Sequence, residues 1–250
     1  MNKIRPDSSS ALEGALRDGM SLVVGGFGLC GVPENLLRRV VASGIKDLVV
    51  ISSNMGTDDG GAGVLLKTRQ VRKVIASFAG GNKLFERLVL DGVVEWEMVP
   101  QGTLFERLRA GGAGIAGFYT PTGATTAIAA GREIRDFDDK PHMFERALRA
   151  DLALIKAFRG DPLGNLVYRK TARNGNPVIA TAADLVVAEV EEIVRPEDLD
   201  PDLVHTPGIY VDRVVRGERY DKPVEFKTCR PRQDSSRPEA LPASLSGSPG

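Results

Sequence analysis

The sequence predicts an α/β fold in which a mostly parallel sheet is covered by helices on both faces. Two observations carry this prediction: short apolar runs alternate with amphipathic helical segments, and glycine, proline or a capping residue marks most of the boundaries. The first four strands are expected at 21–24, 48–51, 74–76 and 95–98. Later apolar runs, which supply further strands or short helices, lie at 152–155, 178–180, 185–190 and 209–211.

End signals place the helices between these strands. Ser10 and Glu13 form a capping-box pair for a first helix that ends near Gly19. A second helix is expected to begin at Pro33, which suits a first helical position, and to end at Gly44. Two more helices are expected, one over 84–89 closed by Gly92 and one opened by the pair Thr103 and Glu106.

Three stretches look irregular. Residues 111–131 are rich in Gly, Thr and Ala and are expected to form a ligand-facing loop region, while 163–165 read as a hairpin turn. From Arg230 the chain is Pro, Ser, Arg and Gly with almost no apolar content. We therefore predict a single domain over 1–229 and a disordered tail over 230–250.

Composition excludes several functional classes. The 33 basic and 33 acidic residues give a net charge of zero, which argues against nucleic-acid binding and fits a surface partly covered by other subunits. The two cysteines, Cys30 and Cys229, form no disulfide framework and no metal-binding spacing. No signal peptide and no run of membrane length are found, so a cytoplasmic protein is expected.

The most informative segment is the glycine-rich loop that follows the first strand: Gly25, Gly26, Phe27, Gly28, Leu29, Cys30 and Gly31. Such a loop presents backbone N–H groups at the carboxyl edge of a sheet, where α/β proteins bind ligands. Two interpretations stay open, a turn that needs positive φ and a backbone that a ligand approaches closely. A G-x-G-x-x-G spacing fits Gly26, Gly28 and Gly31, but no acidic residue ends the second strand, so a dinucleotide site is weakly supported.

Other candidate residues each have a plain alternative. Gln101 is either a solvated surface amide or a donor aimed at an oxyanion, and Asn54 either forms a turn or faces a substrate. Asp58 and Asp59 resemble turn formers more than a general-base pair. A Cys30 thiolate would need His142 or His205 beside it, and the acidic run Glu189, Glu191 and Glu192 is expected at a solvated edge or a subunit contact.

The order of motifs resembles the alpha (A) chain of the class I coenzyme A transferases, especially those that act on 3-oxo acids such as acetoacetate or 3-oxoadipate. The resemblance reaches from about Asp18 to Tyr220, with two departures: Ser53 stands where many relatives carry Asn, and Gly175 where they usually carry an aromatic residue. The matching segments are 18–33, 53–59, 65–71, 100–107, 109–115, 118–123 and 188–194.

This resemblance implies a three-layer fold and CoA transfer from an acyl-CoA, with succinyl-CoA as the expected donor and no permanently bound cofactor. It implies that residues 25–31 contact CoA or the acyl group, that Gln101 supports the oxyanion, and that Asn54 faces the acid substrate. The family's nucleophilic glutamate lies on a second, beta (B) chain of the CoA-transferase, and no glutamate here has its sequence context. We therefore expect half an active site, in a hetero-oligomer with an interface through 54–63 and 111–123.

Two other functions remain as alternatives to the transferase. One is a nucleotide-dependent oxidoreductase that uses Gly26–Gly31 for a pyrophosphate, and the other is a non-catalytic metabolite-binding module on a similar sheet. No basic stripe or DNA-binding segment supports the second alternative.

Overall fold

The structure, a computed structural model, describes residues 2–218 and 220. Its main feature is a sheet with the strand order β1-β12-β11-β9-β2-β3-β4-β5, in which neighbouring strands are parallel. The short β10 pairs antiparallel with β9. The strands are β1 Ile4–Arg5, β2 Ser21–Val24, β3 Leu48–Ile51, β4 Val71–Ala76, β5 Glu95–Met98, β9 Ala150–Gly160, β10 Leu166–Val167, β11 Ala183–Ile193 and β12 Arg213–Arg216.

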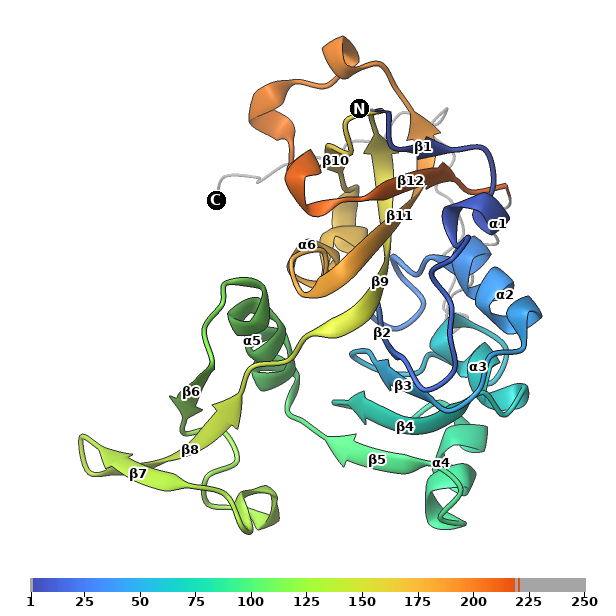
Figure 1. Cartoon of the computed structure of the whole chain (residues 1–250). Coiled ribbons are helices and arrows are strands. Elements are labelled where there is room, and N and C mark those ends of the chain that lie inside the picture. Colours follow the sequence, from blue (N-terminus) through green and yellow to red (C-terminus); the bar gives the residue numbers. More distant parts are fainter. Residues whose placement is uncertain (1, 219, 221–250) are drawn as a thin grey trace, which may run out of the picture.

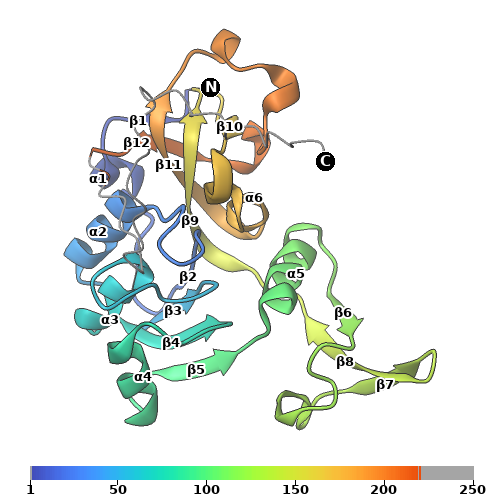
Figure 2. The same cartoon turned by 180° about the vertical axis from the view of Figure 1, so that it is seen from behind.

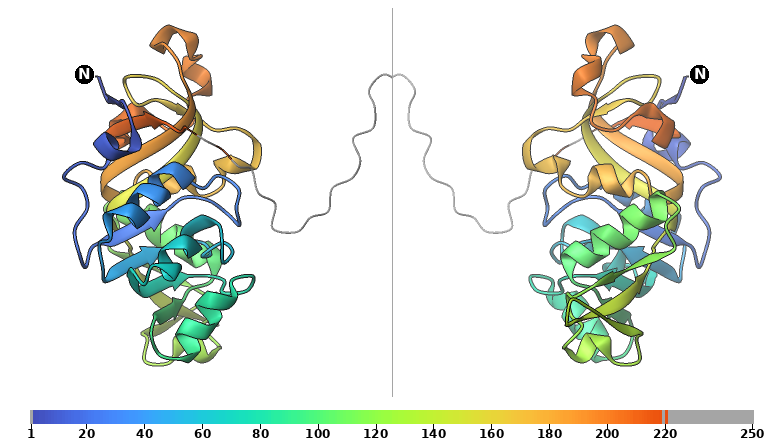
Figure 3. Two further views of the ribbon diagram at one scale, coloured as in Figure 1. Left: turned by 90° about the vertical axis from the view of Figure 1, so that its right-hand side faces the viewer. Right: turned by 90° about the vertical axis from the view of Figure 1, so that its left-hand side faces the viewer.

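Helices cover this sheet on both faces, as the sequence predicts (Figures 1 and 2). One face carries α1 Ser8–Ala11, α2 Glu34–Ser43, α3 Val64–Lys67 and α4 Lys83–Leu90. The other carries α5 Gln101–Gly112 and α6 Asn176–Ile179. The two side views show this layering, with α2 in front of the sheet in one and α5 in the other (Figure 3). Short 3-10 turns lie at 61–63, 127–129, 170–173, 196–198, 201–203 and 208–210.

Two hydrophobic cores, one on each face of the sheet, explain why the strands read as continuous apolar runs. In β2, Leu22 and Val24 belong to the core beneath α1–α4, whereas Val23 belongs to the core beneath α5 and α6. Successive side chains of a strand point to opposite faces, so a strand buried on both faces needs apolar residues at every position.

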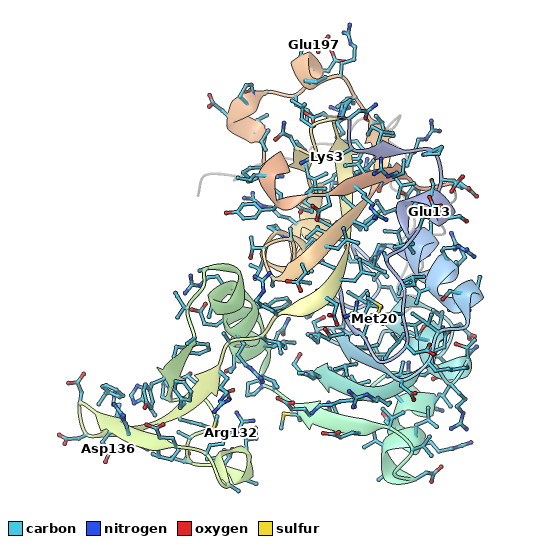
Figure 4. The ribbon with its side chains drawn as sticks, in the orientation of Figure 1. Lys3, Glu13, Met20, Arg132, Asp136 and Glu197 are labelled. Atoms are coloured by element: carbon cyan, nitrogen blue, oxygen red, sulfur yellow. The ribbon has the colours of Figure 1, made fainter. Side chains whose placement is uncertain are left out.

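A second, three-stranded antiparallel sheet projects from the end of α5 as an arm (Figure 1). It consists of β6 Gly117–Thr120, β8 Lys140–Arg146 and β7 Ile134–Phe137, in that order. Figure 4 shows Arg132 and Asp136 on this arm, with Asp136 towards its far end. The expectation of an irregular loop over 111–131 was therefore wrong in part, because 117–120 form a strand.

Several predicted boundaries were also wrong. Asp7, not Ser10, caps the first helix, since its carboxylate accepts the Ser10 N–H at 2.8 Å. The predicted capping box of Thr103 and Glu106 is absent, because α5 begins at Gln101 and Thr103 is buried inside the helix. Residues 178–180 lie at the end of α6 and 209–211 begin in a 3-10 turn, so these two runs are short helical segments, one of the two alternatives expected for them.

Other expectations were confirmed. The helix after Pro33 ends at Gly44 with φ +71°, and a hairpin joins β9 to β10. The predicted tail, 230–250, and Cys229 lie outside the described residues, and the single-domain organisation stays a prediction.

Glu189 is not solvated, contrary to the sequence-based expectation. Its carboxylate lies on β11, fully buried, and accepts hydrogen bonds from the Asn35 side chain at 2.7 Å and the Leu36 N–H at 2.9 Å. Burial raises the pKa of this carboxyl, against the lowering effect of those two donors. The residue thus supplies the acceptor that Pro33, the N-cap of α2, lacks.

A chain of ion pairs ties the arm to the main sheet. Glu145, 2% exposed on β8, pairs with Arg132 and lies 3.7 Å from Arg107 of α5. Arg107 in turn donates to Glu97 of β5 at 2.8 Å, and Lys73 reaches the same carboxylate. Burial by itself raises the pKa of Glu97, but the hydrogen bonds from Arg107 and Lys73 outweigh it and lower the pKa below its ordinary value.

We expect Glu145→Ala to lower the free energy of unfolding by about 3 kcal/mol, because it removes a buried carboxylate and leaves the half-buried Arg132 without its partner. The control is Glu192→Ala, which removes an exposed pair with Arg159 and is expected to cost at most about 1 kcal/mol. Urea unfolding of both variants provides the measurement. Equal losses would contradict a structural role for this chain of ion pairs.

Candidate functional site

The candidate site lies at the carboxyl edge of the main sheet, where β2, β3 and β4 end side by side. Serine side chains join the segments that leave these strands. Ser53 donates its hydroxyl to the Gly26 carbonyl at 3.1 Å, and Ser77 donates its own to the Ser53 carbonyl at 2.6 Å. The segments that follow β2, β3 and β4 are therefore connected by hydrogen bonds and do not form independent loops.

The glycine loop folds back on itself in a tight turn. Phe27 and Cys30 exchange two backbone hydrogen bonds of 3.0 Å, which leaves Gly28 and Leu29 at the tip. Gly26 has φ +120° and Gly28 has φ +57°, values that favour glycine. A Cβ atom at Gly26 would also lie 2.7 Å from the Val32 side chain. The turn-forming interpretation of these glycines is thus correct for the loop itself.

The same loop also leaves donors for a ligand. The N–H groups of Gly26, Gly28 and Leu29 make no hydrogen bond to any other described residue. Gly26 is buried and Gly28 and Leu29 are half-buried, and a buried backbone N–H without a partner is rare in folded proteins. These groups can therefore donate to an anionic or carbonyl oxygen that reaches the loop.

The side chains of the loop point in different directions. Phe27 is 52% exposed, whereas a methyl carbon of Leu29 lies 3.1 Å from where a Cβ would stand at Gly60. Leu29 therefore packs on the 56–61 loop. The Cys30 thiol lies 3.1 Å from the Thr171 hydroxyl.

Asn54 follows β3, as expected, but its amide is occupied locally. The side-chain oxygen accepts the Gly56 N–H at 2.7 Å, and the nitrogen donates to the Ser53 hydroxyl at 3.2 Å. The turn-forming role is therefore present, and contact with a substrate would have to use the remaining hydrogen-bonding capacity of the amide. Ser53 is buried and donates its hydroxyl to the loop carbonyl of Gly26.

Gln101 is the first residue of α5 and is exposed. Its side-chain amide makes no hydrogen bond to any other residue among 2–218 and 220, so it can donate to a ligand. β5 and β2 are separated by β3 and β4, which puts roughly 14 Å of sheet between the starting points of the two candidate groups. A ligand or partner must extend along the edge to contact both.

The helix that begins with Gln101 nevertheless packs against the segment that contacts the glycine loop. Phe105, one turn further along α5, lies against Gly175: a Cβ atom there would be 2.1 Å from the phenyl ring. Phe105 thus fills the space that a side chain at position 175 would occupy. The next residue, Asn176, contacts the glycine loop, and no local sequence pattern indicates this contact.

The other candidate groups do not assemble into a site. His142 lies on the arm in contact with Phe137, and His205 accepts the Tyr168 N–H, so neither supports a Cys30–His pair. Asp58 accepts the Leu84 N–H and Asp59 pairs with Lys67, as turn and capping residues do. Within the described ranges there is no cluster of three His, Cys, Asp or Glu residues suited to a metal ion, and no helix with the length and hydropathy to cross a bilayer.

Comparison with known families fits this geometry. Residues 7–217 match the family model described as coenzyme A transferase. The chain belongs to the coenzyme A transferase family. The free N–H groups of the loop therefore belong to an enzyme that uses CoA thioesters as substrates, and the oxidoreductase and non-catalytic alternatives are set aside.

Named relatives cover nearly the whole transferase chain. It is 54% identical over 230 residues to the A chain of the succinyl-CoA:3-ketoacid coenzyme A transferase of Helicobacter pylori, covering 92% of this chain and 99% of that protein. It is also 48% identical to the mitochondrial succinyl-CoA:3-ketoacid coenzyme A transferase 2A of Rattus norvegicus, covering 91% of this chain but 47% of that protein. In the rat enzyme, a region like this chain makes up about half of a longer polypeptide.

Solved structures show the same fold. An acyl-CoA transferase of Escherichia coli O157:H7, solved as a thioester complex with CoA, superimposes with a TM-score of 0.77 at 21% identity, over 86% of this chain and 47% of that chain. Glutaconate coenzyme A-transferase from Acidaminococcus fermentans gives a TM-score of 0.75 at 19% identity, over 86% and 75% of the two chains. The predicted fold class is therefore confirmed.

Proposed function

We propose that this protein is the alpha chain of a two-chain transferase that moves CoA from succinyl-CoA to a 3-oxo acid. The names and coverage of its relatives support this proposal, and acetoacetate is the acceptor that we favour over 3-oxoadipate. The observation that carries it in the structure is the set of free N–H groups at Gly26, Gly28 and Leu29, which lies at the same sheet edge as the free amide of Gln101.

In the proposed reaction, a glutamate of the beta chain attacks the thioester carbonyl of succinyl-CoA. The C–S bond breaks, which gives a succinyl–glutamyl anhydride and the CoA thiolate. The thiolate then attacks the glutamyl carbonyl, which forms a glutamyl–CoA thioester and releases succinate. The acceptor carboxylate repeats the two steps in reverse order and leaves as its CoA thioester, so the glutamate is regenerated.

The role of the alpha chain in this scheme is electrostatic. Each attack places negative charge on a carbonyl oxygen, and preorganised N–H donors stabilise that charge in a site from which water is excluded. The loop donors and Gln101 are suited to this, and Asn54 lies between them at the end of β3 for contact with the acid.

The partner is expected to cover the same edge. Two phenylalanines are exposed there, Phe27 at 52% and Phe78 at 60%, and Phe78 pairs with Asn54 across the ends of β3 and β4. Exposed aromatic residues beside polar donors are typical of interface centres. We propose that the contact includes the segments 54–63 and 111–123, the second of which leads into the arm, in an assembly of two alpha and two beta chains.

We expect the enzyme in the cytoplasm. Purification of the two chains after their co-expression there tests this proposal. Light scattering is expected to give a hetero-oligomer, and the pair is expected to form acetoacetyl-CoA from succinyl-CoA and acetoacetate. The same assay with 3-oxoadipate distinguishes the two acceptors. A chain that stays monomeric beside its partner at micromolar concentration would contradict the proposal.

A further inference from the structure

One buried amide lies directly behind the glycine loop. Asn176, the first residue of α6, is 0% exposed. Its side-chain oxygen accepts the Lys156 N–H at 3.0 Å, and its nitrogen donates to the carbonyls of Gly31 at 3.0 Å and Ala172 at 2.9 Å. A single side chain therefore joins β9, the end of the glycine loop and the 170–173 turn.

Asn176 also takes the place of a backbone partner in the sheet. β2 pairs with β9 up to the bond from the Gly25 N–H to the Leu154 carbonyl, which is 2.9 Å long. If this parallel ladder continued, the Lys156 N–H would donate to the carbonyl of Gly25. It donates to Asn176 instead, at the point where β2 ends and the loop begins.

The position of this amide explains why two residues of the loop are glycines. A Cβ atom at Gly25 would lie 1.8 Å from the Asn176 oxygen, a distance that excludes any side chain. At Gly31, φ is +76° and a Cβ atom would lie 3.0 Å from the Asn176 nitrogen and equally close to the Ala172 backbone. Gly25 therefore makes room for Asn176, and Gly31 makes room for Asn176 together with the Ala172 backbone, whereas Gly26 and Gly28 serve the turn.

Neighbouring side chains add to this contact. Asn174 donates its amide to the Cys30 carbonyl at 3.0 Å, and the Thr171 hydroxyl lies 3.1 Å from the Cys30 thiol. Cys30 and Thr171 are 141 residues apart in the sequence. The Cys30 end of the turn is thus tied to one short segment that is distant along the chain.

From these contacts we propose that Asn176 is a positioning residue, which fixes the loop so that the N–H groups of Gly26, Gly28 and Leu29 face the acyl-CoA. The inference rests on the proposed function, since it assigns these donors to the thioester. It predicts that Gly25 and Asn176 depend on each other, and that the requirement for glycine at 25 does not come from the ligand.

A double-mutant cycle in the co-expressed enzyme tests this dependence. Gly25→Ala alone is expected to lower kcat/KM for succinyl-CoA by roughly 10²-fold, because the added methyl group displaces the loop. Asn176→Ala alone is expected to lower kcat/KM by roughly 10-fold, mainly through KM. In the double variant the missing amide leaves room for the methyl group, so its kcat/KM is expected to be close to that of Asn176→Ala.

Two results would overturn the proposal: losses that multiply in the double variant, or wild-type kcat and KM in Asn176→Ala. Asn165→Ala is the matched control, since Asn165 also donates and accepts, with Asp161 and Gly208, but in the distant β9–β10 hairpin. It is expected to lower the melting temperature without changing KM.

A milder variant covers the case in which Asn176→Ala does not assemble. Asn174→Ala removes an exposed side chain that donates to Cys30, and it is expected to raise KM by about 5-fold, because the glycine loop loses one hydrogen bond. An unchanged KM would count against the proposal. If the wild-type pair itself transfers no CoA, it is the proposed function that fails.

Discussion

Gly26→Val is expected to reduce the turnover of the assembled enzyme by more than roughly 10²-fold. The residue has φ +120°, and a Cβ atom there would lie 2.7 Å from the Val32 side chain. A β-branched residue must therefore shift the backbone at the buried N–H group that we propose as a donor to the ligand. Steady-state kinetics with succinyl-CoA, together with a binding titration of acyl-CoA, measure the effect.

Gly92→Val is the matched control for this variant. Gly92 follows α4, has φ +68°, and a Cβ atom there would meet nothing within 4 Å. A valine at position 92 strains the backbone but meets no neighbouring atom, and it lies away from the glycine loop. The variant should therefore lower the free energy of unfolding without lowering turnover. Normal acyl-CoA binding by Gly26→Val would remove the loop from the site.

Gln101→Ala is expected to lower kcat by roughly 10²-fold while the two chains still assemble. The amide is exposed and bonds no other described residue, so its removal leaves no buried group unpaired and should not change the melting temperature. Only the stabilisation of a charged oxygen by its N–H group is lost.

The control for general effects on α5 is Glu106→Ala. Glu106 lies on the same helix, where its side chain pairs with Arg109, and the variant is expected to keep normal turnover. Unchanged kcat in Gln101→Ala would show that Gln101 is simply a solvated surface residue.

The sheet could be predicted because its strands are buried on both faces. The runs at 21–24 and 48–51 match β2 and β3 to the residue, since a short run that is apolar at nearly every position is typical of a strand buried on both faces. The N-termini of the helices were predicted less accurately from the sequence. Asp7 caps α1 one turn earlier than the Ser10–Glu13 pair suggested, because several polar residues in a row can each accept the first N–H groups.

The arm could not be predicted from local sequence. Its β7 strand is exposed at all four positions, so it lacks the apolar alternation that marks a half-buried strand. Its contacts with the main sheet include the ion pair of Glu145 with Arg107 of α5. These residues lie far apart in the sequence, and no local pattern indicates that they pair.

In the candidate site, too, the local sequence pattern predicted some features, whereas others depend on residues that are distant along the chain. The glycine loop was found because a strand followed by glycines is a local pattern. The partners that shape it, Asn174 and Asn176, lie 144 and 145 residues from Cys30 and Gly31, so only the fold reveals that Gly25 and Gly31 accommodate an amide. Ser53 likewise acquires a clear role, as a donor to the loop, only when β2 and β3 are seen side by side.

The most direct test of the central claim, that this protein supplies half of a CoA-transferase site, is a mixing experiment. The purified chain is assayed for acetoacetyl-CoA formation from succinyl-CoA and acetoacetate, first alone and then with increasing amounts of the beta chain. We expect no transfer by the chain alone, because the proposed reaction uses a glutamate nucleophile of the partner, and we expect activity that rises to a plateau at one beta chain per alpha chain. Transfer at a normal rate by this chain alone would contradict the claim.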